Sequence, residues 1–387
     1  MRPLNPVVAG CPPSGIRRFF DIAASMDDVI SLGVGEPDYV TPWRVREAGI
    51  AALERGLTTY TSNAGLPELR EAVCDDLDRR HGVRYQAGGE CLITSGVSEG
   101  LDLALRVLLE PGDEVLIPEP CYVAYGPCVA FAGGTPVYVP TGSADGFRLH
   151  AAAVEAAVTP RTKAILVGSP ANPTGAVQDR GDLAALIELA VRHDLYLISD
   201  EIYERLSYTG PHTCLASLPG ARDRTVLLGG FSKAHAMTGW RVGFLCAPAP
   251  VAELAGRIHQ YTMLCASHIS QAAAVEALLG GESDVRQMVA DYDRRRRVFT
   301  KGLREIGLDC PEPGGAFYAF PSIAATGLTS QEFAERLLRD THVAVVPGDV
   351  FGPSGEGHIR CCYATALPLL EEALVRMDRF VRQLMKG

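Results

Sequence analysis

The sequence predicts an α/β fold in which a mostly parallel sheet of seven strands carries helices on both faces. The chain has 387 residues, which exceeds the usual size of one hydrophobic core and predicts a large domain plus a smaller one. From about residue 91, short apolar runs alternate with amphipathic stretches, and glycine, proline, aspartate or serine bounds the runs. The predicted strands are residues 91–95, 114–118, 136–140, 163–168, 195–199, 225–230 and 241–247.

Amphipathic helices are predicted between these strands. Residues 99–110 (EGLDLALRVLLE) and 182–194 (DLAALIELAVRHD) place apolar side chains at intervals of three and four residues. After about residue 250 the sequence changes to long charged stretches such as 283–307, followed by a shorter tail that carries strands, which predicts a second domain. The run Arg294–Arg297 could bind a phosphate or a nucleic acid, but acidic residues before it at helical spacing favour a solvated helix face.

The composition excludes several classes of function. A net charge of -10 and a pI near 5.4 do not suit a polyphosphate ligand, so nucleic-acid binding is not expected. The 11 cysteines form no CxxC pair or regular framework, so we expect neither disulfides nor a metal site, and the adjacent Cys361 and Cys362 are interpreted as core residues. No apolar run suits a signal peptide or a membrane span, and the expected location is the cytoplasm.

Chemically unusual residues follow the predicted strands at their carboxyl ends. In open α/β sheets ligands bind beyond these ends, because loops and helix N-termini converge there. One crevice is therefore expected to hold all of these residues. They are Gly96, Val97 and Ser98 after the first strand, Asn172 after the fourth, Asp200 and Tyr203 at the end of the fifth, and Ser232 and Lys233 at the end of the sixth.

Each of these features also has a structural interpretation. The Gly96–Ser98 turn offers N–H groups to an anion at a helix start, yet it also suits an ordinary helix cap. Asp200 after a buried strand requires a cationic or N–H partner, unless it is a surface loop residue. Lys233 would be a nucleophile if its amine were desolvated, whereas a lysine there could equally extend to the solvent.

Taken together, these motifs resemble the class I and II aminotransferases of fold type I, which depend on pyridoxal phosphate. Ser232-Lys233 followed by Gly239-x-Arg241-x-Gly243 is similar to the lysine signature of that family. Passages such as SLGVGEPD and FSKAHAMTGWRVGF resemble the microbial aspartate and aromatic aminotransferases. Further similar motifs cover nearly the whole chain: GEPD (35–38), TYTSNAG (59–65), TSGVSEG (94–100), PCYVAY (120–125), SPANPTG (169–175), SDEIYE (199–204), GAFY (315–318) and HIRCCYA (358–364).

The resemblance implies a catalytic role for three residues. Lys233 would bind the cofactor covalently and later carry a proton between substrate and cofactor. Asp200 would keep the pyridine nitrogen protonated, and Tyr203 with Asn172 would hydrogen-bond the phenolic oxygen. Tyr122 would stack on the ring.

The resemblance also implies the anion sites. The Gly96–Ser98 turn, Ser232 and Arg241 would hold the cofactor phosphate, with Tyr60 reaching in from the partner subunit of a homodimer. Arg360 would clamp the substrate α-carboxylate bidentately, assisted by Asn172 and the Gly35 backbone.

The domain boundaries follow from the same resemblance. Residues 45–280 would form the large cofactor-binding domain, and 285–387 the small α+β domain, which residues 1–40 would complete. Residues 1 to about 15 would form a flap over the site.

The expected function is transfer of an amino group from an L-amino acid to a 2-oxo acid. Glutamate and 2-oxoglutarate would be one substrate pair, with aspartate or an aromatic amino acid as donor. A C–S β-lyase or a related eliminating enzyme on the same fold would need the same Lys233, Asp200 and Arg360. A non-enzymatic regulator that binds the cofactor is a third alternative, but it would need a DNA-binding domain for which no length precedes residue 30.

Overall fold

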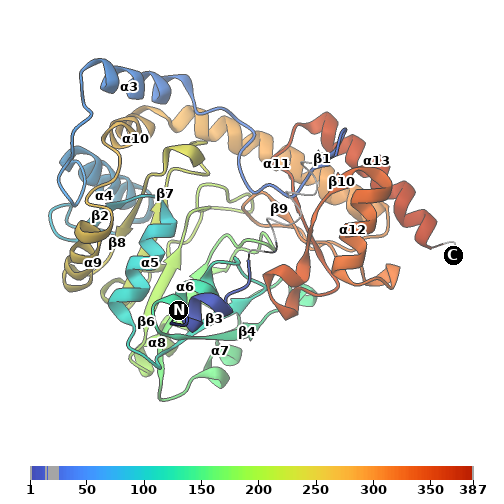
Figure 1. The fold of residues 1–387 in the computed structure, drawn as a ribbon, viewed down its shortest axis with the longest axis horizontal. Helices are drawn as coiled ribbons and strands as arrows, with labels where there is room; N and C mark the ends of the chain where they lie inside the picture. The colour runs from blue at the N-terminus through green and yellow to red at the C-terminus, as the bar shows by residue number, and fades with distance from the viewer. Residues whose placement is uncertain (1, 14, 16–25, 386–387) are drawn as a thin grey trace.

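A seven-stranded sheet forms the centre of the larger part of the molecule (Figure 1). The computed structural model describes residues 2–13, 15 and 26–385. All seven predicted strands are present, and their bounds differ from the prediction by two residues at most, so the predicted mostly parallel α/β sheet is confirmed. In spatial order they are β2 (Cys91–Thr94), β8 (Gly243–Cys246), β7 (Thr225–Gly230), β6 (Tyr196–Asp200), β5 (Thr162–Gly168), β3 (Glu114–Glu119) and β4 (Thr135–Pro140).

Strand β8 is the exception to the parallel arrangement. It runs antiparallel to both of its neighbours, β2 and β7, and the other five strands from β7 to β4 pair in parallel. Strand β2 therefore points in the same direction as β7, so its carboxyl end lies at the same edge as the carboxyl ends of β5, β6 and β7. This edge brings the predicted site residues together.

Helices cover both faces of the sheet because successive apolar side chains along its strands point to opposite faces. In β5, Ala164 and Leu166 pack towards one helical layer, while Ile165 and Val167 pack towards the other. The first layer contains α5 (Val97–Leu108), α6 (Tyr125–Phe131) and α9 (Ala249–Thr262). The second contains α7 (Ala151–Ala157), α8 (Arg180–Arg192), α4 (Pro67–His81) and α10 (His268–Gly280), against which α3 (Trp43–Glu54) packs.

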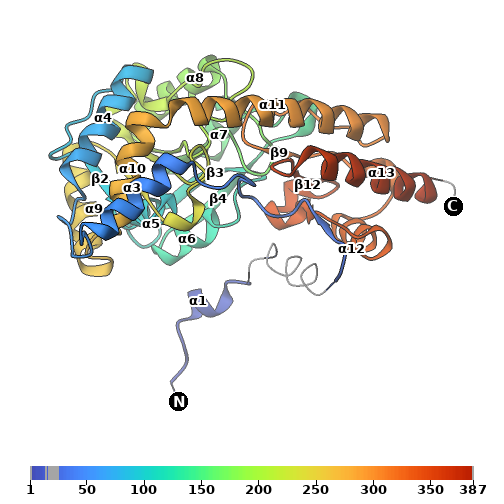
Figure 2. The same cartoon turned by 90° about the horizontal axis from the view of Figure 1, so that it is seen from above.

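A second hydrophobic core joins the two ends of the chain. Near the N-terminus, β1 (Ile30–Ser31) pairs in parallel with β10 (Val343–Ala344). A three-stranded antiparallel sheet lies in the same part of the molecule, with the order β11 (Val346–Pro347), β12 (Ile359–Cys362) and β9 (Tyr318–Ala319). The helices here are α12 (Ser330–Thr341), α13 (Leu367–Leu384) and the 24-residue α11 (Glu282–Glu305), which runs from beside α10 towards α13 (Figure 2).

The prediction of a solvated face for Arg294–Arg297 is wrong for its two central members. Arg295 and Arg296 each expose only 7% of their surface. The preceding acids do pair with them at helical spacing, Asp291 with Arg295 and Asp293 with Arg296. Each arginine also pairs with a carboxylate outside α11, which compensates its charge where it is buried. Asp38 binds Arg295, and Glu312 binds Arg296. The run therefore ties α11 to neighbouring segments and does not form a basic surface.

The prediction that the adjacent Cys361 and Cys362 are core residues is confirmed, because both are buried. All 11 cysteines are free thiols, and Cys11, Cys128 and Cys265 are partly exposed. Within the described ranges, no helix combines the length and the apolar character that crossing a membrane requires.

Candidate active site

One cavity of about 410 Å³ lies at the carboxyl edge of the large sheet. Segments far apart in the sequence line it, because strand ends β5, β6 and β7 meet there with the start of α5 and with residues from the second core. The predicted site residues that line the cavity are Gly35, Val97, Ser98, Tyr122, Asn172, Asp200, Tyr203, Ser232, Lys233, Arg241 and Arg360.

Asp200 ends β6 inside this cavity, where its side chain is almost completely buried. The hydroxyl of Tyr125 donates a hydrogen bond to its Oδ2 (2.8 Å), and the backbone N–H of Ile202 donates to its Oδ1 (3.2 Å). Burial raises the pKa of Asp200, and the Tyr125 hydroxyl opposes that rise. The sequence prediction missed Tyr125, although it belongs to the PCYVAY motif that supplied Tyr122.

Lys233 follows β7 and reaches back into the cavity. Its Nζ donates a hydrogen bond to the Gly35 carbonyl (2.8 Å) and lies 5.6 Å from the centre of the Tyr203 ring. Burial lowers the pKa of Lys233 to about 8. The amine therefore loses its proton at a lower pH than an exposed lysine does, which favours the uncharged form that attacks carbonyl compounds.

The start of α5 offers backbone donors to the cavity. Gly96 is its N-cap with φ 80°, and no side chain caps the helix. A β-carbon at this position would lie 2.7 Å from Nη2 of Arg241, so only glycine allows the guanidinium to approach. Because Val97 and Ser98 both line the cavity, the first free N–H groups of α5 and the Arg241 charge form a setting for an anion.

Arg360, in β12, is a buried cation that exposes 2% of its surface. Its hydrogen-bond partners are neutral, and no carboxylate among the described residues forms an ion pair with it. Its Nη1 donates to Oδ1 of Asn172 (2.9 Å), and its Nη2 donates to the Gly33 carbonyl (2.6 Å). Since burying an uncompensated charge is costly, this guanidinium indicates an anionic ligand.

Tyr318 is a second residue of the cavity that the sequence prediction missed. Its hydroxyl forms a hydrogen bond with that of Tyr203 (2.7 Å), and its ring lies 4.6 Å from Cζ of Arg360. A β-carbon on Gly35 would lie 2.4 Å from the Tyr318 hydroxyl, which explains the glycine there. Tyr318 ends the GAFY motif, so the motif was visible in the sequence but its contact was not.

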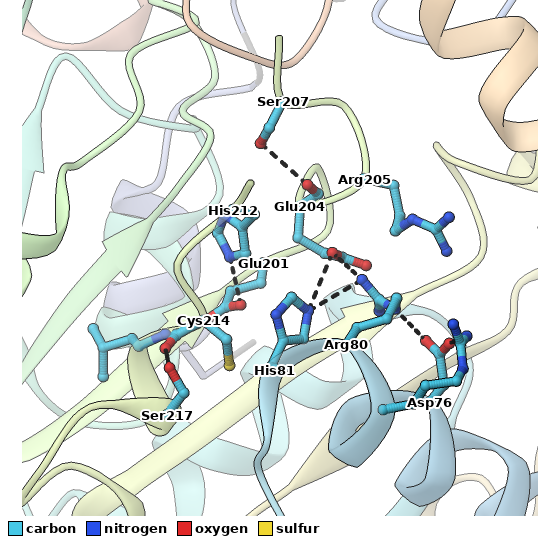
Figure 3. Close-up of polar contacts among 12 residues, drawn as sticks. Asp76, Arg80, His81, Glu201, Glu204, Arg205, Ser207, His212, Cys214 and Ser217 are labelled. Atoms are coloured by element: carbon cyan, nitrogen blue, oxygen red, sulfur yellow. Dashed lines mark hydrogen bonds and ion pairs between the residues drawn. The ribbon is translucent and has the colours of Figure 1, made fainter. Parts of the chain in front are cut away.

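The segment that carries Asp200 and Tyr203 also carries two carboxylates that do not line the cavity, Glu201 and Glu204 (Figure 3). Glu201 accepts hydrogen bonds from His212 (2.7 Å) and from the Leu215 N–H (2.9 Å). Burial acts to raise the pKa of Glu201, but the neighbouring His212 holds it below its usual value.

Glu204 is held in the same way by residues of α4. Arg80 donates to its Oε2 (2.5 Å) and also to Asp76 (2.8 Å), and His81 lies 3.5 Å away (Figure 3). Burial acts to raise the pKa of Glu204, but contacts with His81 and Arg80 lower it overall. These largely buried ion pairs connect the turn after β6 to α4.

Some predicted features lie outside the cavity. Tyr60 exposes 78% of its surface and does not line it. Of the predicted flap, Met1 and Ser14 lie outside the described residues. The helix α1 (Pro6–Gly10) has no buried residue, lies beside α6, and supplies nothing to the cavity lining. Among residues 2–13, 15 and 26–385, no group of histidines, cysteines and acids is arranged to hold a metal.

The seven-stranded sheet, with a buried lysine and carboxylate at its carboxyl edge, defines an α/β enzyme of the fold type I group. The family description "Aminotransferase class I and II" matches residues 27–377. The chain belongs to this family of enzymes, which transfer amino groups.

Two relatives and one solved structure illustrate the similarity. The aspartate aminotransferase of Pyrococcus abyssi is 46% identical over 374 residues, which cover 96% of each chain. The aromatic-amino-acid aminotransferase 2 of Thermococcus litoralis is 44% identical over 374 residues, again 96% of each chain. The structure of the Thermus thermophilus aspartate aminotransferase with maleate is 39% identical, has a TM-score of 0.94, and covers 98% of this chain and 100% of that chain.

Proposed function

We propose that this aminotransferase uses pyridoxal phosphate to move an amino group from aspartate or an aromatic amino acid to a 2-oxo acid, with glutamate and 2-oxoglutarate as one substrate pair. The observation that carries the proposal is that Arg360, buried and with no acidic partner among the described residues, lines the same cavity as the desolvated amine of Lys233. A guanidinium and a nucleophilic amine in one cavity suit a ligand that has a carboxylate and a carbonyl or amino group. The names of the aspartate and aromatic relatives support the choice of donors.

The residues of the cavity fit pyridoxal phosphate. When bound, this cofactor supplies an aldehyde for amines and a ring that accepts electrons. The uncapped start of α5 beside Arg241 suits its phosphate, the buried Asp200 suits its ring nitrogen, and Lys233 suits its aldehyde. The proposed cofactor-binding residues are Tyr60, Gly96, Val97, Ser98, Tyr122, Asn172, Asp200, Tyr203, Ser232, Lys233 and Arg241.

Each catalytic residue then has one task. Asp200 holds a proton on the ring nitrogen through its negative charge, and Tyr203 donates a hydrogen bond to the phenolic oxygen. Arg360 orients the substrate by its α-carboxylate, with Asn172 and the Gly35 backbone beside it. Lys233 moves the proton at the substrate α-carbon as a general base and acid, for which its lowered pKa suits it.

We further propose that the enzyme is a cytoplasmic homodimer in which Tyr60 serves the partner's site. Large apolar side chains are exposed along α3 and near the end of α9, at Trp43, Leu53 and Tyr261, and a second copy would cover them. Free thiols throughout the chain support a reducing compartment.

We assign residues 45–280 to a large domain and 285–387 with residues 1–40 to a small one, which the pairing of β1 with β10 supports.

A half-reaction with one amino acid and no oxo acid tests the proposed function. The cofactor-loaded enzyme is expected to convert the amino acid to its 2-oxo acid once, with the cofactor left in its amine form. An eliminating enzyme would instead release pyruvate repeatedly and keep the cofactor in its aldehyde form. Protein purified in the presence of pyridoxal phosphate that binds none of it would refute the proposal.

A further inference from the structure

A buried pair, Glu99 and His259, lies directly behind the turn that opens α5. His259 is completely inaccessible to solvent and the Glu99 side chain is 10% exposed. One carboxylate oxygen of Glu99 accepts a hydrogen bond from Nδ1 of His259 (2.5 Å), and the other accepts from the backbone N–H of Ser95 (2.5 Å). Neither residue lines the cavity.

The hydrogen bond between Glu99 and the Ser95 N–H stabilises the start of α5 without occupying the free N–H groups of the helix. A helix start is usually capped by a side chain on the N-cap residue, which occupies the first free N–H groups. Here the N-cap is Gly96, so no such side chain competes with a ligand for the N–H groups of Val97 and Ser98. The Glu99 side chain instead accepts a hydrogen bond from the backbone N–H of Ser95, which precedes the N-cap. The N–H groups of Val97 and Ser98 therefore stay free for a ligand.

The position of Glu99 would otherwise oppose anion binding. Its carboxylate lies within the first turn of α5, where its charge would repel a phosphate. His259 fixes this carboxylate on the side of the turn away from the cavity. The helix that carries His259, α9, packs along α5 and β2, which fixes the backbone position of the histidine. Its Nε2 is buried and has no hydrogen-bond partner among the described residues, so Glu99 is the polar partner of the ring.

We propose that Glu99 and His259 are positioning residues that shape the phosphate site of the cofactor without touching the cofactor. This inference rests on the proposed function. The inference depends on the length of the Glu99 side chain, because its carboxylate must contact both the Ser95 N–H and His259. A shorter acid keeps the charge but cannot span both partners, whereas glutamine keeps the length and loses the charge.

The test compares two ligands that differ only in the phosphate. Dissociation constants for pyridoxal phosphate and for pyridoxal are measured on full-length protein freed of cofactor, for the parent, Glu99→Asp, Glu99→Gln and His259→Ala. Glu99→Asp and His259→Ala are expected to bind pyridoxal phosphate about tenfold more weakly, with the affinity for pyridoxal unchanged. Glu99→Gln is expected to bind both ligands nearly as the parent does, because its amide oxygen can accept from the Ser95 N–H while its NH2 group donates to Nδ1 of a neutral His259 that carries its proton on Nε2.

Asp102→Ala is the matched control, because Asp102 is another acid on α5 and forms an exposed pair with Arg106. It is expected to bind both ligands as the parent does. The inference is overturned if Glu99→Asp binds pyridoxal phosphate as tightly as the parent, or if it loses affinity for both ligands equally, which would indicate a general structural defect. A parent protein that binds neither ligand would refute the proposed function instead.

Discussion

The hydroxyl of Tyr125 donates a hydrogen bond to the carboxylate of Asp200 across 2.8 Å, inside the protein. Because this bond stabilises the charged form, it counteracts the rise that burial causes in the pKa of Asp200. Tyr125 therefore helps Asp200 to remain an anion, which its proposed role beside a protonated ring nitrogen requires.

Tyr125→Phe is expected to raise the pKa of Asp200, because it removes a donor to the charged form. The acidic limb of the pH profile of kcat should then move to higher pH, and kcat at neutral pH should fall about tenfold, as for loss of a hydrogen bond to a charged group. Steady-state rates between pH 5 and 9 check this. Tyr196→Phe, at the other end of β6, is the control, and an unshifted limb in Tyr125→Phe would contradict the assignment.

Lys233 should capture pyridoxal phosphate faster as the pH rises. Burial lowers the pKa of Lys233 to about 8, and only the uncharged amine attacks an aldehyde. The capture rate in cofactor-free protein should therefore rise through pH 8 and level off above it. Stopped-flow absorbance measures the rate, and borohydride should fix the cofactor to the parent and to Lys163→Ala but not to Lys233→Ala. Label fixed at another residue would refute the anchor.

Arg360→Lys should weaken substrate binding although the charge is kept. A lysine has one ammonium group and cannot hold Asn172, the Gly33 carbonyl and both oxygens of a carboxylate at once. KM for the amino acid should rise about a hundredfold, with a smaller change in kcat. Arg339→Lys, on an exposed pair, is the control. An unchanged KM would remove Arg360 from the substrate site.

Glu204→Gln should lower the free energy of unfolding by about 2 kcal/mol at pH 7, because it leaves the largely buried Arg80 with Asp76 as its one remaining acidic partner among the described residues. The folded pKa of Glu204 lies below its usual value, so its contribution is present above the unfolded pKa of about 4.3 and is lost as the pH falls further. Urea unfolding at pH 7, 5 and 3 should show the difference between parent and variant shrinking at the lowest pH.

The matched control for this prediction is Glu253→Gln, which breaks an exposed pair with Arg257 and should cost nothing measurable. A difference between parent and Glu204→Gln that stays constant from pH 7 to 3 would show that packing, and not charge, explains the loss.

The sequence predicted the elements of the fold because apolar runs and their breaks are local signals. It did not predict that β8 runs antiparallel, since the period of a strand carries no direction. It also misplaced Arg295 and Arg296, because the acids that draw them inside include Asp38, which lies far away along the chain. A local sequence pattern cannot reveal a partner that lies so far away along the chain.

The same limit applies to the cavity. Lys233 and Asp200 were predicted correctly as cavity residues because they lie at or just after the carboxyl ends of buried strands and belong to recognisable motifs. Tyr125, Tyr318 and Glu99 also lie within quoted motifs, but Asp200, Tyr203 and His259, which they contact, are 75 or more residues away, so the motifs did not indicate these contacts.

The carbonyls of Gly33 and Gly35 accept hydrogen bonds from Arg360 and Lys233. A ribosome releases the amino end first, so the Gly33 carbonyl has no partner until Arg360 has been made, 327 positions later. The cavity is therefore completed only after β12 has been made, and a translation product that stops before β12 lacks the guanidinium proposed to hold the substrate.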